Sequence, residues 1–326
     1  MGRASPRKDD QEPRVSVVIA TYNRSALLPR LVHALENQTF AEPFEVIFVD
    51  DGSDDGTPDV LAGLSRESRL PIRVLGDGQN HRQAVARNTG WRAARAPIVA
   101  FTDDDCVPTP DWLARGVDAL GNGARVVVGR TIPDPDQEWK RGPFSRTISV
   151  LDEALFETCN IFYRRADLET AGGFDEAFTS HGGEDTDLGW RIRKGGAEAV
   201  FEPSALVHHD IKPSDLPAAV REAFRWTGIP RVVRLHPEGR SYLMGGLFWK
   251  PSHPYALAAA AGVLLAPRSR VALALALPWL WYRIKQAPLD PGRRVRLTAL
   301  PGALLIDLAE VGAMVRGSIR HRTFVL

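Results

Sequence analysis

Three consecutive carboxylates, Asp103, Asp104 and Asp105, follow an apolar run at residues 97–101 that is typical of a buried strand. Carboxylates there are costly unless a charge neutralises them, and Mg²⁺ or Mn²⁺ prefers such oxygen ligands. An extended segment would place Asp103 and Asp105 on the same side. A solvated acidic turn is the alternative, but the strand-end position favours a metal site.

Asp51 and Arg87 are candidates for binding a nucleotide. Asp51 follows the apolar run at residues 45–49, where its carboxylate could accept from a base N–H or a ribose hydroxyl. A simple turn helped by Gly52 and Ser53 is the alternative. Arg87 lies on a predicted helix over residues 82–96 and could pair with a phosphate or a base carbonyl. A salt bridge to the acidic cluster is the other interpretation of Arg87, and both can hold.

A second acidic group, Glu184 and Asp185, follows two glycines and opens a predicted helix that runs to Lys194. Carboxylates are stabilised at helix N-termini, so a capping role is one interpretation. The other is a general base that removes a proton from an acceptor hydroxyl.

Two adjacent histidines, His208 and His209, end a later strand pattern, and either could supply one metal ligand. The cysteines, Cys106 and Cys159, have no Cys or His at metal-ligand spacing in the sequence. We therefore interpret both as small buried residues.

The elements that must position these side chains alternate between strand and helix patterns over the first hundred residues. Strands are predicted at residues 15–21, 45–49, 72–75 and 97–101. This alternation predicts a parallel sheet with helices on both faces, which binds ligands beyond the carboxyl ends of its strands. Three polar clusters stand at those ends: residues 21–24, 50–51 and 103–105. We expect them to converge on one edge.

Four motifs in order make the sequence recognisable: VSVVIATYNR, EVIFVDDGSDDGT, AVARNTGWRAARAPIVAFTDDDC and GGFDEAFTSHGGEDTDLGWRIRKGG. They resemble the family 2 glycosyltransferases of the GT-A fold over about residues 14–210. The last motif is also similar to the C-terminal portion of galactosyl- and N-acetylgalactosaminyltransferases. The resemblance implies an inverting enzyme that uses a nucleotide-diphosphate sugar and Mn²⁺ or Mg²⁺. It implies a mixed, mainly parallel α/β sheet with a C-terminal α-helical tail.

The resemblance also implies roles for individual residues. The donor nucleotide would be bound by Thr21, Tyr22, Asn23, Arg24, Asp51, Arg87, Asp103 and Asp104. Asp103 and Asp105 match the ends of the family's DxD motif, with Asp103 near the ribose and Asp105 on the metal. His209 best matches the late metal-site histidine, and His208 remains an alternative. Asp185 matches the catalytic base, with Glu184 beside it contacting a sugar.

The sequence also departs from part of the family. It has no QxxRW motif and no pair of long apolar segments of the kind found in polymer-extruding relatives, so we expect non-processive transfer. UDP is the default donor nucleotide, with GDP and dTDP as alternatives. The acceptor would be a glycan or a lipid-linked sugar in cell-surface glycan, polysaccharide or glycolipid assembly, with a small molecule as the alternative. A sugar nucleotidyltransferase is one alternative, although the glycine-rich loop expected after its first strand is missing. A non-catalytic membrane-bound module that binds nucleotide sugars is another.

Charge is divided unevenly along the chain. Overall, 41 Lys and Arg oppose 40 Asp and Glu, which argues against a nucleic-acid partner. Residues 265–326 carry +7, however, leaving −6 for the rest. We predict a disordered arm (1–13), a catalytic domain (14–245) and a basic helical region (246–326) that associates with an anionic membrane surface. The alternative for this last region is a helical subdomain that only packs on the catalytic core. Only two cysteines and a polar N-terminus predict a cytoplasmic protein, peripheral on the inner face of the cell membrane.

Overall fold

The computed structural model describes residues 12–179, 182–286 and 297–326, so most of the predicted disordered arm lies outside the described residues. The chain forms two compact units. Unit 1 comprises the residues up to Asp134 together with Ile148–Thr179 and Glu184–Asp210. Unit 2 comprises Pro135–Thr147, Ser180–Gly183 and Ile211–Leu326. The functional limits predicted for the catalytic domain, 14–245, stay a prediction, because compactness alone does not say which residues act in catalysis.

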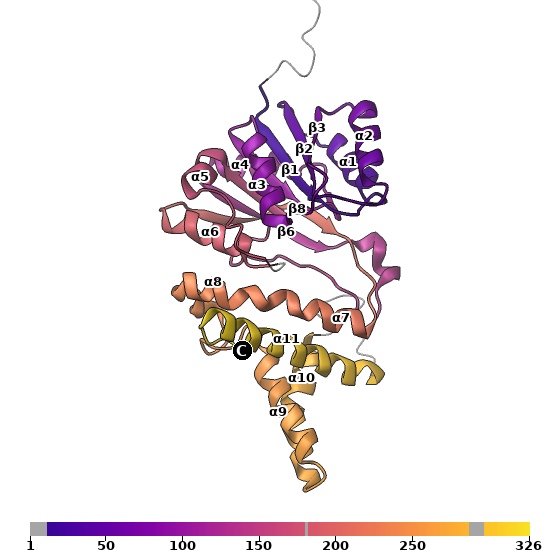
Figure 1. The fold of residues 1–326 in the computed structure, drawn as a ribbon, viewed down its shortest axis with the longest axis vertical. Coiled ribbons are helices and arrows are strands. Elements are labelled where there is room, and N and C mark those ends of the chain that lie inside the picture. Colours follow the sequence, from indigo (N-terminus) through magenta and orange to yellow (C-terminus); the bar gives the residue numbers. More distant parts are fainter. Residues whose placement is uncertain (1–11, 180–181, 287–296) are drawn as a thin grey trace, which may run out of the picture. The chain divides into compact units, whose positions relative to one another are not determined.

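Unit 1 is built on a mixed sheet with the strand order β3-β2-β1-β4-β7-β6-β8-β5 (Figure 1). Strands β3, β2, β1 and β4 run parallel, β6 and β8 are also parallel, and the remaining pairs are antiparallel. The predicted mixed, mainly parallel sheet is therefore confirmed. The strands are β1 (Val15–Thr21), β2 (Phe44–Asp50), β3 (Ile72–Leu75), β4 (Ile98–Thr102), β5 (Cys106–Pro108), β6 (Val126–Pro133), β7 (Asn160–Arg164) and β8 (Ala199–His209).

The strands form where β-branched and aromatic side chains are buried on both faces. Val17 and Ile19 of β1 and their partners Val46 and Phe48 on β2 are fully buried on one face. Val18 and its partner Ile47 are buried on the other. One strand prediction needs correction: the apolar runs at residues 198–201 and 205–207 predict two short strands, but both belong to a single strand, β8. Its register with β6 shifts between Gly129 and Thr131, which interrupts the pattern within one continuous strand.

Helices cover both faces of this sheet, as predicted. Gly90 of α3 lies against Val18 of β1, whereas Gly116 of α4 lies against Phe162 of β7. Phe162 shares its face with Val17 through the register of β1, β4 and β7, so α3 and α4 lie on opposite faces. The helices of unit 1 are α1 (Leu28–Glu36), α2 (Thr57–Glu67), α3 (Gln83–Ala93), α4 (Trp112–Gly121), α5 (Arg165–Ala171) and α6 (Glu184–Lys194).

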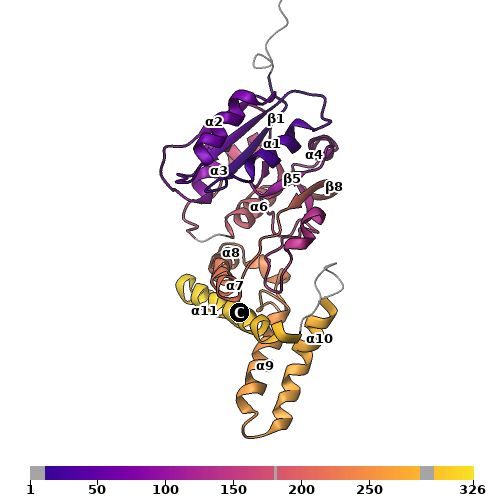
Figure 2. The same cartoon turned by 90° about the vertical axis from the view of Figure 1, so that its right-hand side faces the viewer.

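Unit 2 is helical. Its α-helices are α7 (Leu216–Ala223), α8 (Ile229–Leu235), α9 (Ser252–Leu265), α10 (Leu277–Gln286) and α11 (Leu300–His321). Unit 2 also contains short 3₁₀ segments: η2 (Pro135–Lys140), η3 (Phe224–Gly228), η4 (Pro237–Tyr242), η5 (Arg270–Ala276) and η7 (Leu297–Ala299). Figure 2 shows α9 and α10 side by side as a hairpin. Within the described ranges, none of the helices combines the length and the apolar character needed to cross a bilayer.

Candidate functional site

The polar clusters that follow β1, β2 and β4 meet at one edge of the sheet, because these strands are parallel neighbours. The Arg24 guanidinium, after β1, lies 3.4 Å from the Asp104 carboxylate, after β4. The Asn23 side chain exchanges hydrogen bonds with Asp54, beyond the end of β2. The convergence predicted from the strand ends is confirmed. Tyr22 is exposed at this edge, and Thr21 is buried.

Asp51 fastens the loop that precedes α3. Its two carboxylate oxygens accept hydrogen bonds from the backbone N–H groups of His81 and Arg82, at 2.7 and 2.9 Å. Burial raises the pKa of Asp51, and these two hydrogen bonds oppose the increase. The turn considered for Asp51 belongs to its neighbour, because Asp50 accepts from both the backbone N–H and the hydroxyl of Ser53.

Arg87 connects two acidic clusters that are far apart in the sequence. Its guanidinium donates to Asp103 at 3.1 Å and to Glu184 at 2.9 Å, and the side chain is almost fully buried. Burial works against its charge, but Asp103 and Glu184 outweigh that effect and raise the pKa of Arg87 further. The salt bridge considered for Arg87 is therefore present. It fixes the start of α6 to the acidic turn after β4.

The acidic segment after β4 is a turn, so the expectation of an extended segment is wrong. The N–H of Cys106 donates to the carbonyl of Asp103, which closes the turn. The three carboxylates consequently diverge: Asp103 contacts Arg87, Asp104 contacts Arg24 and Asp105 contacts His209. Burial, with Asp105 close by, raises the pKa of Asp104 to about 7 despite the charge of Arg24.

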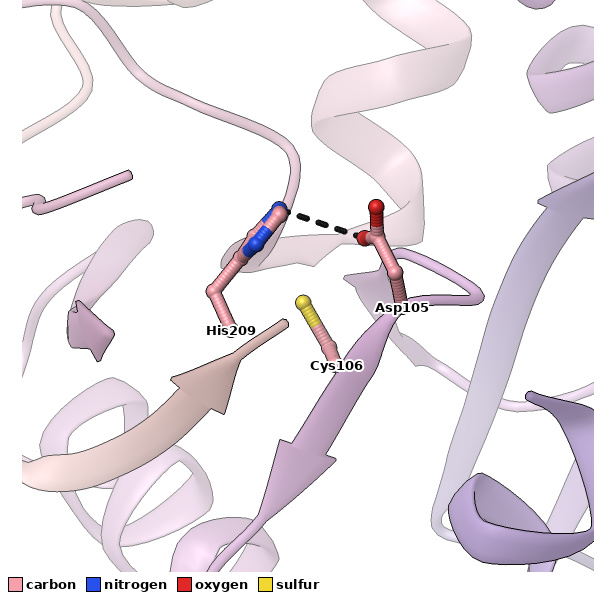
Figure 3. A group of neighbouring side chains, drawn as sticks. All are labelled: Asp105, Cys106 and His209. Carbon is pink, nitrogen blue, oxygen red and sulfur yellow. Dashed lines mark ion pairs between the residues drawn. The ribbon is translucent and has the colours of Figure 1, made fainter. Parts of the chain in front are cut away.

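Asp105, Cys106 and His209 form a compact group in which one ligand atom from each residue lies within 4.8 Å of the others (Figure 3). Antiparallel pairing of β5 with β8 places Cys106 opposite His209. Nε2 of His209 lies 3.2 Å from Oδ1 of Asp105, and Nδ1 lies 3.0 Å from the carbonyl oxygen of Asp210. His209 is buried.

The two contacts of His209 fit a metal site. A carbonyl oxygen only accepts, so Nδ1 carries the hydrogen and the lone pair of a neutral ring lies at Nε2, facing Asp105. Two electron pairs that face each other require a proton or a cation between them. Metal-bound histidines commonly donate their other N–H to a carbonyl in this way. Of the two adjacent histidines, the structure brings His209 to Asp105.

Cys106 completes the group geometrically but has the wrong chemistry for a hard cation. Its thiol contacts the carbonyl oxygen of Cys159 at 3.8 Å, and both thiols are buried. Burial raises the pKa of Cys106 well above its usual range, which disfavours the thiolate that would bind a metal. Asp105 and His209 are therefore the members of the group that suit Mg²⁺ or Mn²⁺.

Glu184 and Asp185 are the first two residues of α6 and face different partners. The Glu184 carboxylate is buried against Arg87, whereas Oδ1 of Asp185 accepts from the N–H of Thr186 at 2.8 Å. Gly182 and Gly183, immediately before them, have φ values of 115° and 105°, which favour glycine. Asp185 thus accepts a hydrogen bond at the start of the helix. The ion pair between Glu184 and Arg87 connects this helix start to the acidic turn after β4.

Glu157 is a buried carboxyl that the sequence reasoning missed. Burial, with Asp185 nearby, raises the pKa of Glu157 to about 8, so it is mainly protonated at neutral pH. Its Oε2 has no hydrogen-bond partner within the described part of the chain. A signal was present, because Glu157 stands three residues before the start of β7, close to a buried strand where an ionised carboxylate is costly.

The matching family models describe glycosyl transferase family 2, over residues 16–179, and glycosyl transferase family group 2, over residues 98–284. The chain is 35% identical over 282 residues to validoxylamine A glucosyltransferase of Streptomyces hygroscopicus subsp. jinggangensis. That alignment covers 75% of this chain and 65% of the relative, so it spans slightly less than two thirds of the relative's length.

Two solved structures share the fold. The mannosyltransferase PcManGT from Pyrobaculum calidifontis, in complex with GDP-Man and Mn²⁺, has a TM-score of 0.64 at 24% identity. The match covers 95% of this chain and 89% of that one. GalNAc-T7 with UDP, GalNAc and Mn²⁺ has a TM-score of 0.51 at 17% identity and covers 72% of this chain and 52% of its own.

Proposed function

The chain belongs to glycosyl transferase family 2 and acts on nucleotide sugars, and from this membership we propose an inverting, divalent-cation-dependent, non-processive hexosyltransferase. The donor is a nucleotide-diphosphate sugar, with UDP as the default nucleotide. The acceptor is the hydroxyl of a glycan or of a lipid-linked sugar.

Donor binding is assigned to the sheet edge where the polar clusters meet. Residues 21–24 and Asp51 line the nucleotide side of this edge, with Asp103 and Asp104 beside them. Arg87 adds its positive charge next to Asp103, where a diphosphate requires it. A Mn²⁺ or Mg²⁺ ion held by Asp105 and His209, with Asp103 close in sequence, would neutralise charge on the leaving diphosphate.

The chemical step is assigned to the start of α6. Asp185 takes the proton of the acceptor hydroxyl while the hydroxyl oxygen forms a bond to the anomeric carbon. The bond from that carbon to the diphosphate oxygen breaks on the opposite side, so the anomeric centre inverts. Glu184, held by Arg87, contacts the acceptor or the donor sugar. General-base assistance of this kind typically contributes about 10²–10⁴-fold.

The observation that supports cation dependence best is the pair formed by Asp105 and His209, whose electron-pair donors face each other at 3.2 Å. A panel of UDP-, GDP- and dTDP-sugars, screened by thermal unfolding with and without Mn²⁺, identifies the donor. The assigned donor should raise the unfolding temperature only when the metal is present. NMR of the product then reports the anomeric configuration.

Two outcomes would contradict this function. Release of pyrophosphate rather than nucleoside diphosphate would indicate a nucleotidyltransferase. Donor binding without acceptor-dependent nucleotide release, over a broad range of acceptors, would indicate a binding module.

We also propose where the enzyme acts. Sugar nucleotides and lipid-linked acceptors meet at the cytoplasmic face of the cell membrane, and the basic C-terminal region would hold the enzyme there as a peripheral protein. Its place in cell-surface polysaccharide or glycolipid assembly follows from the same acceptor class.

A further inference from the structure

The hairpin of α9, η5 and α10 in unit 2 has two contrasting ends (Figure 2). We call residues 263–277 the hairpin tip. Large apolar side chains are exposed throughout it: Val263, Leu264, Leu265, Val271, Leu273, Leu275 and Leu277. Leu264 and Val271 are 74% and 80% exposed. Several large apolar side chains exposed close together in a folded chain typically mark a contact with a membrane or a partner.

The other end of the hairpin is firmly packed. Trp279 of α10 is buried with Ala256 and Ala259 of α9, against apolar side chains of α11. The indole N–H of Trp279 donates to Asp307 at 2.7 Å, and Arg283 forms an ion pair with the same carboxylate. Lys250, just before α9, pairs with Glu310 at 2.6 Å. The base of the hairpin is therefore anchored, while the side chains of its tip are exposed within the described part of the chain.

The two arms of the hairpin also approach each other closely. A Cβ added at Gly262 would stand 2.6 Å from the carbonyl oxygen of Ala272, so only glycine allows this contact. Close packing holds the arms together as one element. The exposed apolar side chains therefore project from an ordered hairpin.

The charges around the tip indicate what covers it. Residues 251–286 contain Arg268, Arg270, Arg283 and Lys285 but no Asp or Glu. Arg268 and Arg270 are exposed at the turn. Farther along α10, beyond the tip and close to the packed base, exposed Trp281 has the Lys285 ammonium 5.1 Å from its ring centre.

A second copy that met this surface with its own tip would bring like charges together. Anionic lipid offers both phosphates for the basic groups and an apolar layer for the leucines and valines. Deep insertion is disfavoured, because it would move Arg268 and Arg270 at the turn away from the phosphates of the lipid headgroups and into the apolar layer.

We propose that the hairpin tip lies shallowly in the headgroup region of an anionic bilayer and is the membrane contact of this protein. The membrane contact itself does not depend on the proposed function. Its consequence, that the attached enzyme uses a lipid-linked acceptor, rests on that function. This inference also narrows the contact from the whole basic C-terminal region to a defined part of it.

The test is co-sedimentation of the full chain with vesicles of phosphatidylglycerol and phosphatidylcholine, and with vesicles of phosphatidylcholine alone. We expect salt-sensitive binding to the anionic vesicles. Leu264→Ser combined with Val271→Ser should weaken this binding at least about tenfold, because both side chains lose apolar surface to insert. Arg268→Gln combined with Arg270→Gln should weaken it and reduce its salt dependence.

The matched control is Ile319→Ser on α11, which removes an apolar side chain that is 76% exposed but lies outside the hairpin. We expect it to bind like the wild type. Equal binding of the tip variant and the wild type, or loss of binding in the control alone, would overturn the proposal. The proposal would also be overturned if the full chain did not bind anionic vesicles at low salt, or if sedimentation velocity showed that it self-associates through the tip.

Thermal unfolding of each variant checks that the hairpin base is intact. Acceptor-dependent release of nucleotide from the donor, measured in solution without vesicles, tests the glycosyltransferase function separately. A failed membrane contact and a failed function are therefore distinguishable.

Discussion

The two ring nitrogens of His209 have different partners, and this difference provides a test of the metal site. Nδ1 is tied to the Asp210 carbonyl, so Nε2 is the atom that can bind a cation beside Asp105. His208, its neighbour, is only half-buried and points to the other side of β8. The pair therefore offers a matched comparison of two adjacent histidines on one strand.

We predict that His209→Ala and Asp105→Ala each abolish the Mn²⁺- or Mg²⁺-dependent part of donor binding, because each removes one ligand atom. His208→Ala should keep it. Isothermal calorimetry of the donor with and without metal measures the effect, and circular dichroism checks the fold. Loss in His208→Ala with retention in His209→Ala would reverse the assignment.

The two carboxylates at the start of α6 differ in their surroundings, which separates their roles. Glu184 is buried in an ion pair with Arg87, so a proton on it would break that pair. Asp185 makes a local hydrogen bond to the next N–H and lies near the protonated Glu157. These surroundings support the proposal that Asp185, rather than Glu184, is the base.

We predict that Asp185→Asn lowers the turnover number at least about a hundredfold while donor affinity changes little, because the amide keeps the shape but cannot accept the proton. Glu184→Gln should weaken substrate binding as well, since Arg87 loses a charged partner. Single-turnover kinetics with donor titration measures both. Turnover near the wild-type rate in Asp185→Asn would move the base to Glu184.

At the scale of elements, the position of α6 depends on how closely it packs. A Cβ at Gly189, in the middle of α6, would stand 2.0 Å from the ring of Phe156, which is fully buried. Phe156 adjoins Glu157, so the same contact positions both the helix that carries Asp185 and the buried carboxyl beside it. Gly63 of α2 has no atom within 4 Å of such a Cβ and serves as a control in an open environment.

We predict that Gly189→Ala destabilises the fold by about 1–3 kcal/mol through overpacking. Gly63→Ala should instead stabilise it by about 0.5–1 kcal/mol, because alanine is the better helix former. Urea unfolding of both variants measures the difference. Equal stability of the two would mean that α6 can shift without cost.

The elements also show which parts of the site could be predicted. The runs that form β1, β2 and β4 consist mainly of buried β-branched and other apolar residues, so their ends and the convergence of the polar clusters follow from local pattern. The sequence suggests a turn at Asp103 only as an alternative and cannot decide for it, because the turn depends on one backbone hydrogen bond to Cys106. The approach of Cys106 to His209 could not be predicted either, because it results from antiparallel pairing of two strands that are distant in the sequence.

At the scale of the whole molecule, the uneven charge of the sequence reflects how its acids are used. Of the three acids among residues 265–326, Asp307 and Glu310 are buried on α11 and paired with Arg283 and Lys250. Asp290 lies outside the described residues. The pairing could not be predicted from the charge count, because Lys250 precedes the basic segment. The excess positive charge of residues 265–326 is therefore carried by Lys285 and by the arginines other than Arg283.

Glu310 links this charge pattern to the stability of the protein. Burial works against its ionised form, but the contacts from His253 and Lys250 outweigh burial and lower the pKa of Glu310 to about 2. A carboxyl whose pKa is lower in the folded chain stabilises the fold above its unfolded pKa of about 4.5. This stabilisation is lost as the pH falls from about 4.5 to about 2.

We predict that Glu310→Gln destabilises the protein by about 1–3 kcal/mol at about pH 7, because a buried charge pair loses one partner. The difference from the wild type should shrink as the pH approaches about 3, where the wild-type carboxyl begins to bind a proton. Urea unfolding at the two pH values measures this, with Glu198→Gln, at an exposed position, as the control. A difference that stays constant with pH would show that Glu310 acts through packing, and the hairpin base would then owe its position to Trp279 and its apolar neighbours rather than to charge.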